Sequence, residues 1–300
     1  MSVALLKKVC TNCKPSSIKT YWANIQALAR VAGRDAVPAS ASWLNDALLK
    51  RVVAMPLNRY KRLTTAAVKA AQMYKVKRPK WSKAMGDAAD KYTRIRESGK
   101  RTKREHENWP KGGYQALSAL AKKLFSEQEH LEKKKKWNTR DLYHYQRYLI
   151  VLFYSKFALR GDLADVRYKK PFGSNWLQKL KTKYKLHIGE HKTARARGAI
   201  ELDVGGTLAD ALDTFLPQLR RLTTHGYLLS TLRTGNRLQR QDMLRLIRNT
   251  TKEHLGKNIG VQLIRVLKVS ASQKEIDKAA ALQQELGHSS TMQKRYISRD

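Results

Sequence analysis

One stretch of this chain, between residues 185 and 204, shows the alternation typical of β-strands, whereas apolar residues recur at helical spacing along most of the rest. Residues 185–189 alternate polar and apolar side chains, the polar segment 191–197 follows, and residues 198–204 alternate again. Alternation with a period of two is typical of strands that bury one face. We therefore predict a β-hairpin with Lys192 near its turn, in a fold that is mainly α with a small β-hairpin or sheet.

Four amphipathic helical patterns precede this hairpin. The first covers residues 15–33, begins at Pro-Ser-Ser and ends at Gly33. The others run from about Trp43 to Val52, from Leu63 to Met73 and from Trp81 to Ile95, and Pro56 ends the second. Helices with one apolar stripe must bury it against one another. The pattern predicts a compact all-α domain over residues 1–97.

A short polar segment, residues 98–113, separates this domain from the rest of the chain. It contains few apolar residues and two turn signals, which is typical of a linker. The remaining residues, 114–300, are predicted to form a second domain. A basic linker that crosses a duplex would lie against its phosphates, and a solvated hinge is the alternative. The candidate DNA contacts are Lys100, Arg101, Lys103 and Arg104 in this segment, with Arg195 and Arg197 in the hairpin.

Charge gives the first indication of a partner. The chain has 61 Lys and Arg against 24 Asp and Glu, a net charge of +37 spread over its whole length. Such an excess favours a polyanion. No apolar run approaches the roughly twenty residues that span a bilayer, no amphipathic anchor stands out, and the first eight residues lack the apolar core of a signal peptide. We expect an intracellular protein that binds double-stranded DNA and no membrane.

The two cysteines, Cys10 and Cys13, form one Cys-x-x-Cys motif. A second pair or nearby histidines would be needed to complete a four-ligand zinc site. Two ordinary reduced thiols are expected, with a shared metal or a redox pair as the alternatives. No resident metal or other cofactor is predicted.

Four short motifs follow in order along the second domain. They are Phe-Ala-Leu-Arg160-Gly-Asp162-Leu-Ala-Asp165, Lys192-Thr193, Leu-Ile-Arg265, and Leu-Gly-His288 with Tyr296 eight positions later. This set resembles the catalytic residues of the tyrosine recombinases, also called the phage-integrase family, over roughly residues 110–300. The short arginine motif and the spacing from His288 to Tyr296 are similar to those of recombinases in viruses and mobile elements of eukaryotes.

The resemblance implies an N-terminal helical core-binding domain and an α+β catalytic domain that clamp DNA. It further implies cleavage and rejoining of strands through a covalent 3′-phosphotyrosine, without metal or ATP. Arginine suits this chemistry because its planar fork donates two hydrogen bonds to a phosphate and stays protonated. The implied roles are nucleophile for Tyr296, phosphate contacts for Arg160, Arg265 and His288, general acid for Lys192, and support of Arg160 for Asp162, with Asp165 as a further candidate.

Gln262 departs from the family pattern, because the family has a histidine three residues before the second arginine. An amide can donate and accept hydrogen bonds but cannot take up a proton, so the base that deprotonates Tyr296 is open. Four residues follow Tyr296, too few for the C-terminal helix that many members pass to a neighbour. A tetramer on recombination sites is expected to form through other contacts, with a monomer or dimer in the absence of DNA.

Two alternative functions remain at this stage. The same chemistry on a single duplex would make a type IB topoisomerase or a hairpin-resolving enzyme. A non-catalytic DNA-binding relic would account for Gln262 by loss of activity. The leading hypothesis is a site-specific recombinase or integrase of a mobile or viral genome.

Overall fold

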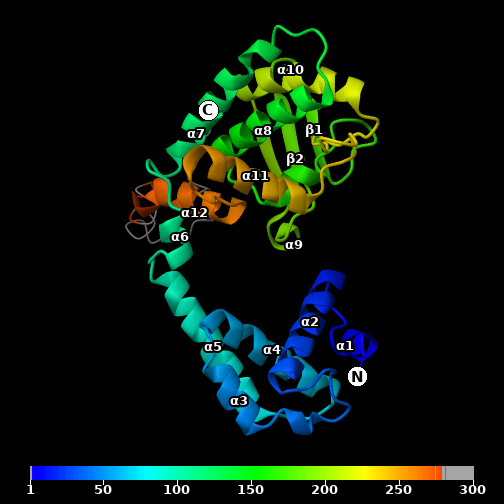
Figure 1. Ribbon diagram of the computed structural model, residues 1–300, viewed down its shortest axis with the longest axis vertical. Coiled ribbons are helices and arrows are strands. Elements are labelled where there is room, and N and C mark those ends of the chain that lie inside the picture. The colour runs from blue at the N-terminus through cyan, green and yellow to red at the C-terminus, as the bar shows by residue number, and fades with distance from the viewer. Residues whose placement is uncertain (1, 274, 279–280, 282–300) are drawn as a thin grey trace. The chain divides into compact units, whose positions relative to one another are not determined.

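A computed structural model describes residues 2–273, 275–278 and 281. The chain divides between Arg101 and Thr102 into two compact units. The structure is mainly helical, with a single three-stranded antiparallel sheet in the described residues (Figure 1). None of the helices in these residues is long and apolar enough to cross a membrane.

The N-terminal unit is built from helices. They are α1 (Val3–Val9), α2 (Pro15–Val31), the 3-10 turn η1 (Ala41–Trp43), α3 (Asp46–Val53), α4 (Leu57–Met73) and α5 (Pro79–Glu97). Proline occupies the first turn of α2 and of α5, where its missing N–H costs no helical hydrogen bond. The four predicted helices are confirmed, and the short helix α1 was not predicted.

Helix α4 lies at the centre of this unit and packs against α2 and α5. Small side chains on α4, Ala66, Ala67 and Ala70, are fully buried and let the neighbouring backbones approach closely. Trp81 of α5 is 2% exposed and donates its indole N–H to the Leu44 carbonyl at 3.2 Å. A buried indole retains a hydrogen bond in this way. The unit has its own closed apolar core.

The C-terminal unit combines helices with the sheet. Its helices are α6 (Lys103–Glu107), α7 (Gln115–Gln128), α8 (Thr139–Lys156), α9 (Ala194–Arg197), α10 (Thr207–Leu222), α11 (Arg240–Leu255) and α12 (Val261–Ala271), with 3-10 turns η2 (Glu129–Leu131) and η3 (Gly161–Asp165). Helix α8 is buried on nearly all sides and contacts α7, α10 and α11 (Figure 1). Its N-terminus carries a capping box of Asn138 and Asp141.

The sheet consists of β1 (Asn175–Lys179), β2 (Tyr184–Ile188) and β3 (Ile200–Val204), in that order. Leu186 of β2 pairs with Leu177 on one side and Leu202 on the other. Alternate residues of β2 are buried in the core, as the period of two predicts. The predicted hairpin is β2–β3 and is confirmed. Strand β1 was not predicted, because its sequence Asn-Trp-Leu-Gln-Lys shows little alternation.

The segment 98–113 contains more structure than a plain linker. Thr102 and Glu105 form a capping box that begins α6: the Thr102 hydroxyl accepts from the Glu105 N–H at 3.3 Å, and the Glu105 carboxylate accepts from the Thr102 N–H at 2.8 Å. The boundary between the two units lies immediately before this cap. The side chains of Lys100, Arg101, Lys103 and Arg104 are exposed.

Candidate active site

Arg160 lies in the turn that leaves the buried helix α8, at the N-cap of η3. Its backbone is held from the core by two buried tyrosines. The Tyr154 hydroxyl donates to the Arg160 carbonyl at 2.6 Å, and the Tyr114 hydroxyl donates to the Tyr154 carbonyl at 2.8 Å. Burial raises the pKa of Tyr154 strongly, so this hydroxyl keeps its proton for the bond. The guanidinium of Arg160 therefore projects from a rigid base.

The connection between β2 and β3, residues 189–199, carries Lys192 and approaches Arg160. The Arg160 Nη1 donates to the Thr193 Oγ1 at 3.3 Å. Lys192 is exposed, as are Arg195 and Arg197 of the single turn α9. The structure thus brings the turn of the predicted hairpin to the first predicted arginine, with Lys192 beside the residue that makes the contact.

His191 holds the β2–β3 connection through hydrogen bonds within it. It is 7% exposed, and its Nε2 lies 2.9 Å from the Gly198 carbonyl oxygen. Its Nδ1 lies 3.4 Å from the Thr193 N–H nitrogen and 3.3 Å from the Thr193 Oγ1. Sequence reasoning did not single out His191, and it included Thr193 in a motif without giving it a role. Both residues are direct neighbours of Lys192 in the sequence, which is the signal that could have identified them.

Asp162 and Asp165 in η3 are held by two arginines that sequence reasoning also missed. Asp162 is 3% exposed and pairs with Arg240 Nη2 at 3.1 Å, while Asp165 accepts from both Arg240 and Arg237. Burial raises the pKa of Asp162, and Arg240, His191 and Arg160 partly offset that increase. These ion pairs hold η3, the turn that follows Arg160.

Gly161 makes this pairing sterically possible. A Cβ at this position would lie 3.0 Å from Cγ and 3.2 Å from Cδ of Arg240, closer than carbon atoms normally approach. The Arg240 side chain therefore crosses directly over the Gly161 backbone to reach both aspartates. Packing therefore explains why a glycine stands between Arg160 and Asp162.

The ring of Tyr227 contacts two further guanidinium groups in this region. The Cζ of Arg237 is 4.0 Å and that of Arg167 is 4.9 Å from the centroid of the Tyr227 ring. Such cation–π contacts add to the ion pair of Arg237 with Asp165. The cluster holds Arg237 in place, and among the described residues the buried Nε atoms of Arg167 and Arg237 have no hydrogen-bond partner.

Arg265 and Gln262 lie together on α12, as predicted. Gln262 is exposed, Arg265 is half-buried, and the Arg265 Nη1 donates to the Gln262 Oε1 at 3.4 Å. Within the described residues, no hydrogen bond or ion pair joins this pair to Arg160 or the β2–β3 connection. His288 and Tyr296 lie outside the described residues.

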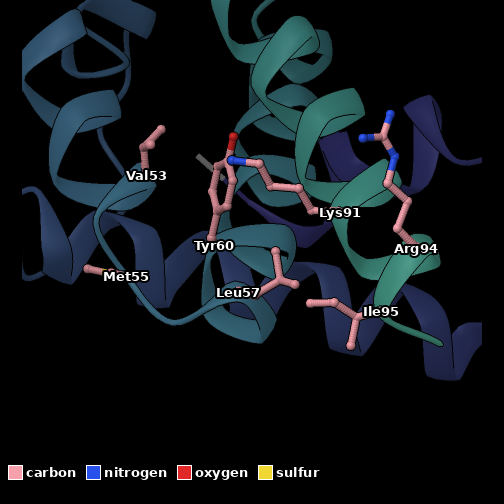
Figure 2. A pocket seen from close by; sticks show the side chains of 7 residues that line it. All are labelled: Val53, Met55, Leu57, Tyr60, Lys91, Arg94 and Ile95. Atoms are coloured by element: carbon pink, nitrogen blue, oxygen red, sulfur yellow. The ribbon is translucent and has the colours of Figure 1, made fainter. Parts of the chain in front are cut away.

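Two hollows in the described surface lie away from these residues. One, of about 420 Å³ in the N-terminal unit, is formed by the α3–α4 turn and the end of α5 and is lined by Met55, Leu57 and Ile95 among others (Figure 2). The other, of about 340 Å³, lies between α8 and α11 and includes the Arg147–Glu253 ion pair. Neither contains a candidate catalytic residue.

The described residues contain no group of three or more His, Cys, Asp or Glu side chains that could hold a metal ion. Cys10 and Cys13 are free thiols at the end of α1, and Cys10 is buried. No protein-family model and no curated protein sequence matches this chain.

Proposed function

We propose that this protein is a site-specific tyrosine recombinase or integrase that cleaves and rejoins double-stranded DNA. The observation that carries the proposal is the contact of Arg160 with Thr193, because it joins the arginine motif to the hairpin that bears Lys192. The two motifs are far apart in sequence, and the resemblance to this family requires them at one phosphate. The net charge of +37 supports a polyanionic substrate.

In the proposed reaction, the Tyr296 oxygen attacks a backbone phosphorus atom and the bond from phosphorus to the 5′ oxygen breaks. Arg160 and Arg265 donate hydrogen bonds to the non-bridging oxygens, where negative charge increases in the transition state. Lys192 gives a proton to the departing 5′ oxygen. His288 donates to the same phosphate. The tyrosine proton passes to solvent or to a group other than Gln262, whose amide cannot take it up.

The 3′-phosphotyrosine conserves the energy of the broken bond, since one phosphodiester replaces another. A 5′ hydroxyl from a second duplex can therefore attack it without ATP. Recombination of two duplexes requires a tetramer on paired sites, and a monomer or dimer is the proposed state without DNA. The proposed place of action is inside the cell, where the target DNA lies.

A nicked duplex that traps the covalent intermediate tests this proposal. Repeats in the DNA that flanks the gene supply the candidate site. The wild-type protein should form an adduct that survives denaturant, and Tyr296→Phe should form none. Tyr92→Phe is the matched control: it removes a hydroxyl from a ring beneath Lys61 in the N-terminal unit and should leave the adduct unchanged.

The other candidate functions are separated from a recombinase by plasmid relaxation, by joining of two sites and by DNA binding, measured beside the adduct assay. A protein that relaxes supercoiled plasmids as a monomer but never joins two sites is a type IB topoisomerase. Sequence-specific binding without an adduct from the wild type indicates a non-catalytic DNA-binding protein, and the proposed reaction is then wrong.

A further inference from the structure

We infer that His191 and Thr193 are positioning residues for Arg160, acting through a directed chain of hydrogen bonds across the β2–β3 connection. The inference rests on the proposed function for its role in catalysis, but the chain of bonds is a feature of the structure by itself. It begins at the carbonyl of Gly198 and ends at the Arg160 guanidinium.

The chemistry of each group sets the direction of every bond in this chain. The Gly198 carbonyl can only accept, so the Nε2 of His191, 2.9 Å away, must carry a hydrogen. In a neutral imidazole, Nδ1 is then an acceptor. It faces the N–H and the hydroxyl of Thr193, and both can donate. The histidine is thereby held in a single tautomer.

Thr193 connects the histidine to the arginine. Its hydroxyl hydrogen points to Nδ1 of His191, at an oxygen-to-nitrogen distance of 3.3 Å. The lone pairs of the hydroxyl then remain for the Arg160 Nη1–H, which can only donate, at 3.3 Å. With a neutral His191 ring, this assignment satisfies all three groups. His191 accepts the hydroxyl hydrogen of Thr193, and this turns the lone pairs of the hydroxyl oxygen toward Arg160.

The chain also fixes the position of Lys192. This residue lies between His191 and Thr193, so the hydrogen bonds hold the backbone on both sides of it, while its own side chain remains exposed. His191 is buried, and the bond to Gly198 closes residues 191–198 into a loop. The β2–β3 connection thus sets the positions of two groups. They are the guanidinium of Arg160, proposed to contact the phosphate, and the ammonium of Lys192, proposed to protonate the departing 5′ oxygen.

The bond from Arg160 to Thr193 uses one of the five N–H groups of the guanidinium, which leaves others for a phosphate. At 3.3 Å it is at the long end of hydrogen bonding, so it orients the group without holding it tightly. Loss of the orientation should slow the chemical step more than it weakens DNA binding, because phosphate contacts over the whole interface dominate affinity.

A double-mutant cycle on single-turnover cleavage tests the inference. Thr193→Val keeps the shape of the side chain and removes the hydroxyl, whereas Thr193→Ser keeps the hydroxyl. His191→Phe keeps a buried ring and removes both nitrogens. A single hydrogen bond to a charged group corresponds to roughly a tenfold to hundredfold change in rate. We expect about a tenfold loss in the cleavage rate for Thr193→Val, near wild-type rates for Thr193→Ser, and unchanged DNA affinity for both.

The double variant distinguishes a chain of bonds from two separate effects. If His191 acts through Thr193, His191→Phe combined with Thr193→Val should be about as slow as either single variant, because both break the same chain. Losses that multiply to about a hundredfold overturn the inference. Wild-type rates for Thr193→Val, or equal losses of binding and cleavage, overturn it as well.

Nitrogen NMR of the His191 ring separates this inference from the proposed function. The expected spectrum shows a hydrogen on Nε2 and none on Nδ1, with an Nδ1 shift that changes in Thr193→Val and not in Thr193→Ser. If the wild-type protein forms no adduct, the proposed reaction is wrong while this spectrum still supports the hydrogen-bond chain. A hydrogen on Nδ1 contradicts the chain, whatever the activity.

Discussion

Replacement of Gly161 by alanine should destabilise the C-terminal unit through a single added methyl group. The new Cβ would lie 3.0 Å from Cγ and 3.2 Å from Cδ of Arg240, and 3.5 Å from Cδ2 of Leu244. Because the backbone of η3 is buried, the Arg240 side chain must move away. That movement lengthens its 3.1 Å contact with Asp162, whose carboxylate is 3% exposed and has little access to water.

Three contributions decide the size of the effect. Overpacking of a close contact costs about 1–3 kcal/mol, and weakening one hydrogen bond of a buried carboxylate costs up to about 2 kcal/mol. Alanine also lowers the conformational entropy of the unfolded chain, and this stabilises the folded state by about 0.4–1 kcal/mol. A flexible side chain absorbs part of the clash, so we expect a net loss of about 1–2 kcal/mol. For a unit of this size, that corresponds to a melting temperature lower by about 3–6 °C.

Urea denaturation of the full chain, monitored by near-ultraviolet circular dichroism, measures this loss. Gly173→Ala is the matched control in the same unit, because its Cβ would meet only the Cδ of Arg167 at an ordinary 3.5 Å. It should leave the midpoint unchanged or raise it slightly. Equal midpoints for Gly161→Ala and Gly173→Ala would refute the argument that Arg240 needs the space over Gly161.

Two further variants test the charges around the sheet and at the candidate site. Burial would raise the pKa of Asp213, but hydrogen bonds from Lys179 and Tyr184 outweigh it and the pKa lies below its ordinary 3.8. The carboxylate therefore stabilises the fold above that value and loses its effect as the pH falls, so the difference in urea midpoint between wild type and Asp213→Asn should narrow from pH 7 to pH 3. Lys192→Ala should slow cleavage by about 10²–10⁴-fold. A DNA substrate with sulfur in place of the bridging 5′ oxygen should restore the cleavage rate of this variant, because a thiolate leaves without a proton. Arg160→Ala is the control, and its cleavage rate should not increase on that substrate.

Most helices could be predicted because each buries one stripe against its neighbours. The patterns along α2, α4 and α5 repeat over many turns, and the structure follows them closely. Helix α1 has seven residues and buries Leu6 alone, so it offers no repeat to detect. Strand β1 has its register from pairing with β2, which is a long-range property that its own five residues do not encode.

In the candidate site too, local sequence motifs predicted some residues, whereas contacts between distant segments could not be predicted. Arg160 and Lys192 stand in recognisable local motifs, and the structure brings their segments together through Thr193. The partners of the two aspartates could not be foreseen, because Arg237 and Arg240 lie on a distant segment with no motif of their own among 61 basic residues. Pairing of charges across a fold depends on which surfaces meet, and local spacing does not contain that information.

The separate apolar cores of the two units suggest how the protein can be divided in practice. Each core closes within its own unit, and the second unit begins with the capping box of Thr102 and Glu105. A chain opened between Arg101 and Thr102 would interrupt no helix and expose neither core. Expression of residues 1–101 and 102–300 as two polypeptides, with only the second isotopically labelled, would allow spectra of His191 and Thr193 to be recorded without signals from the first unit.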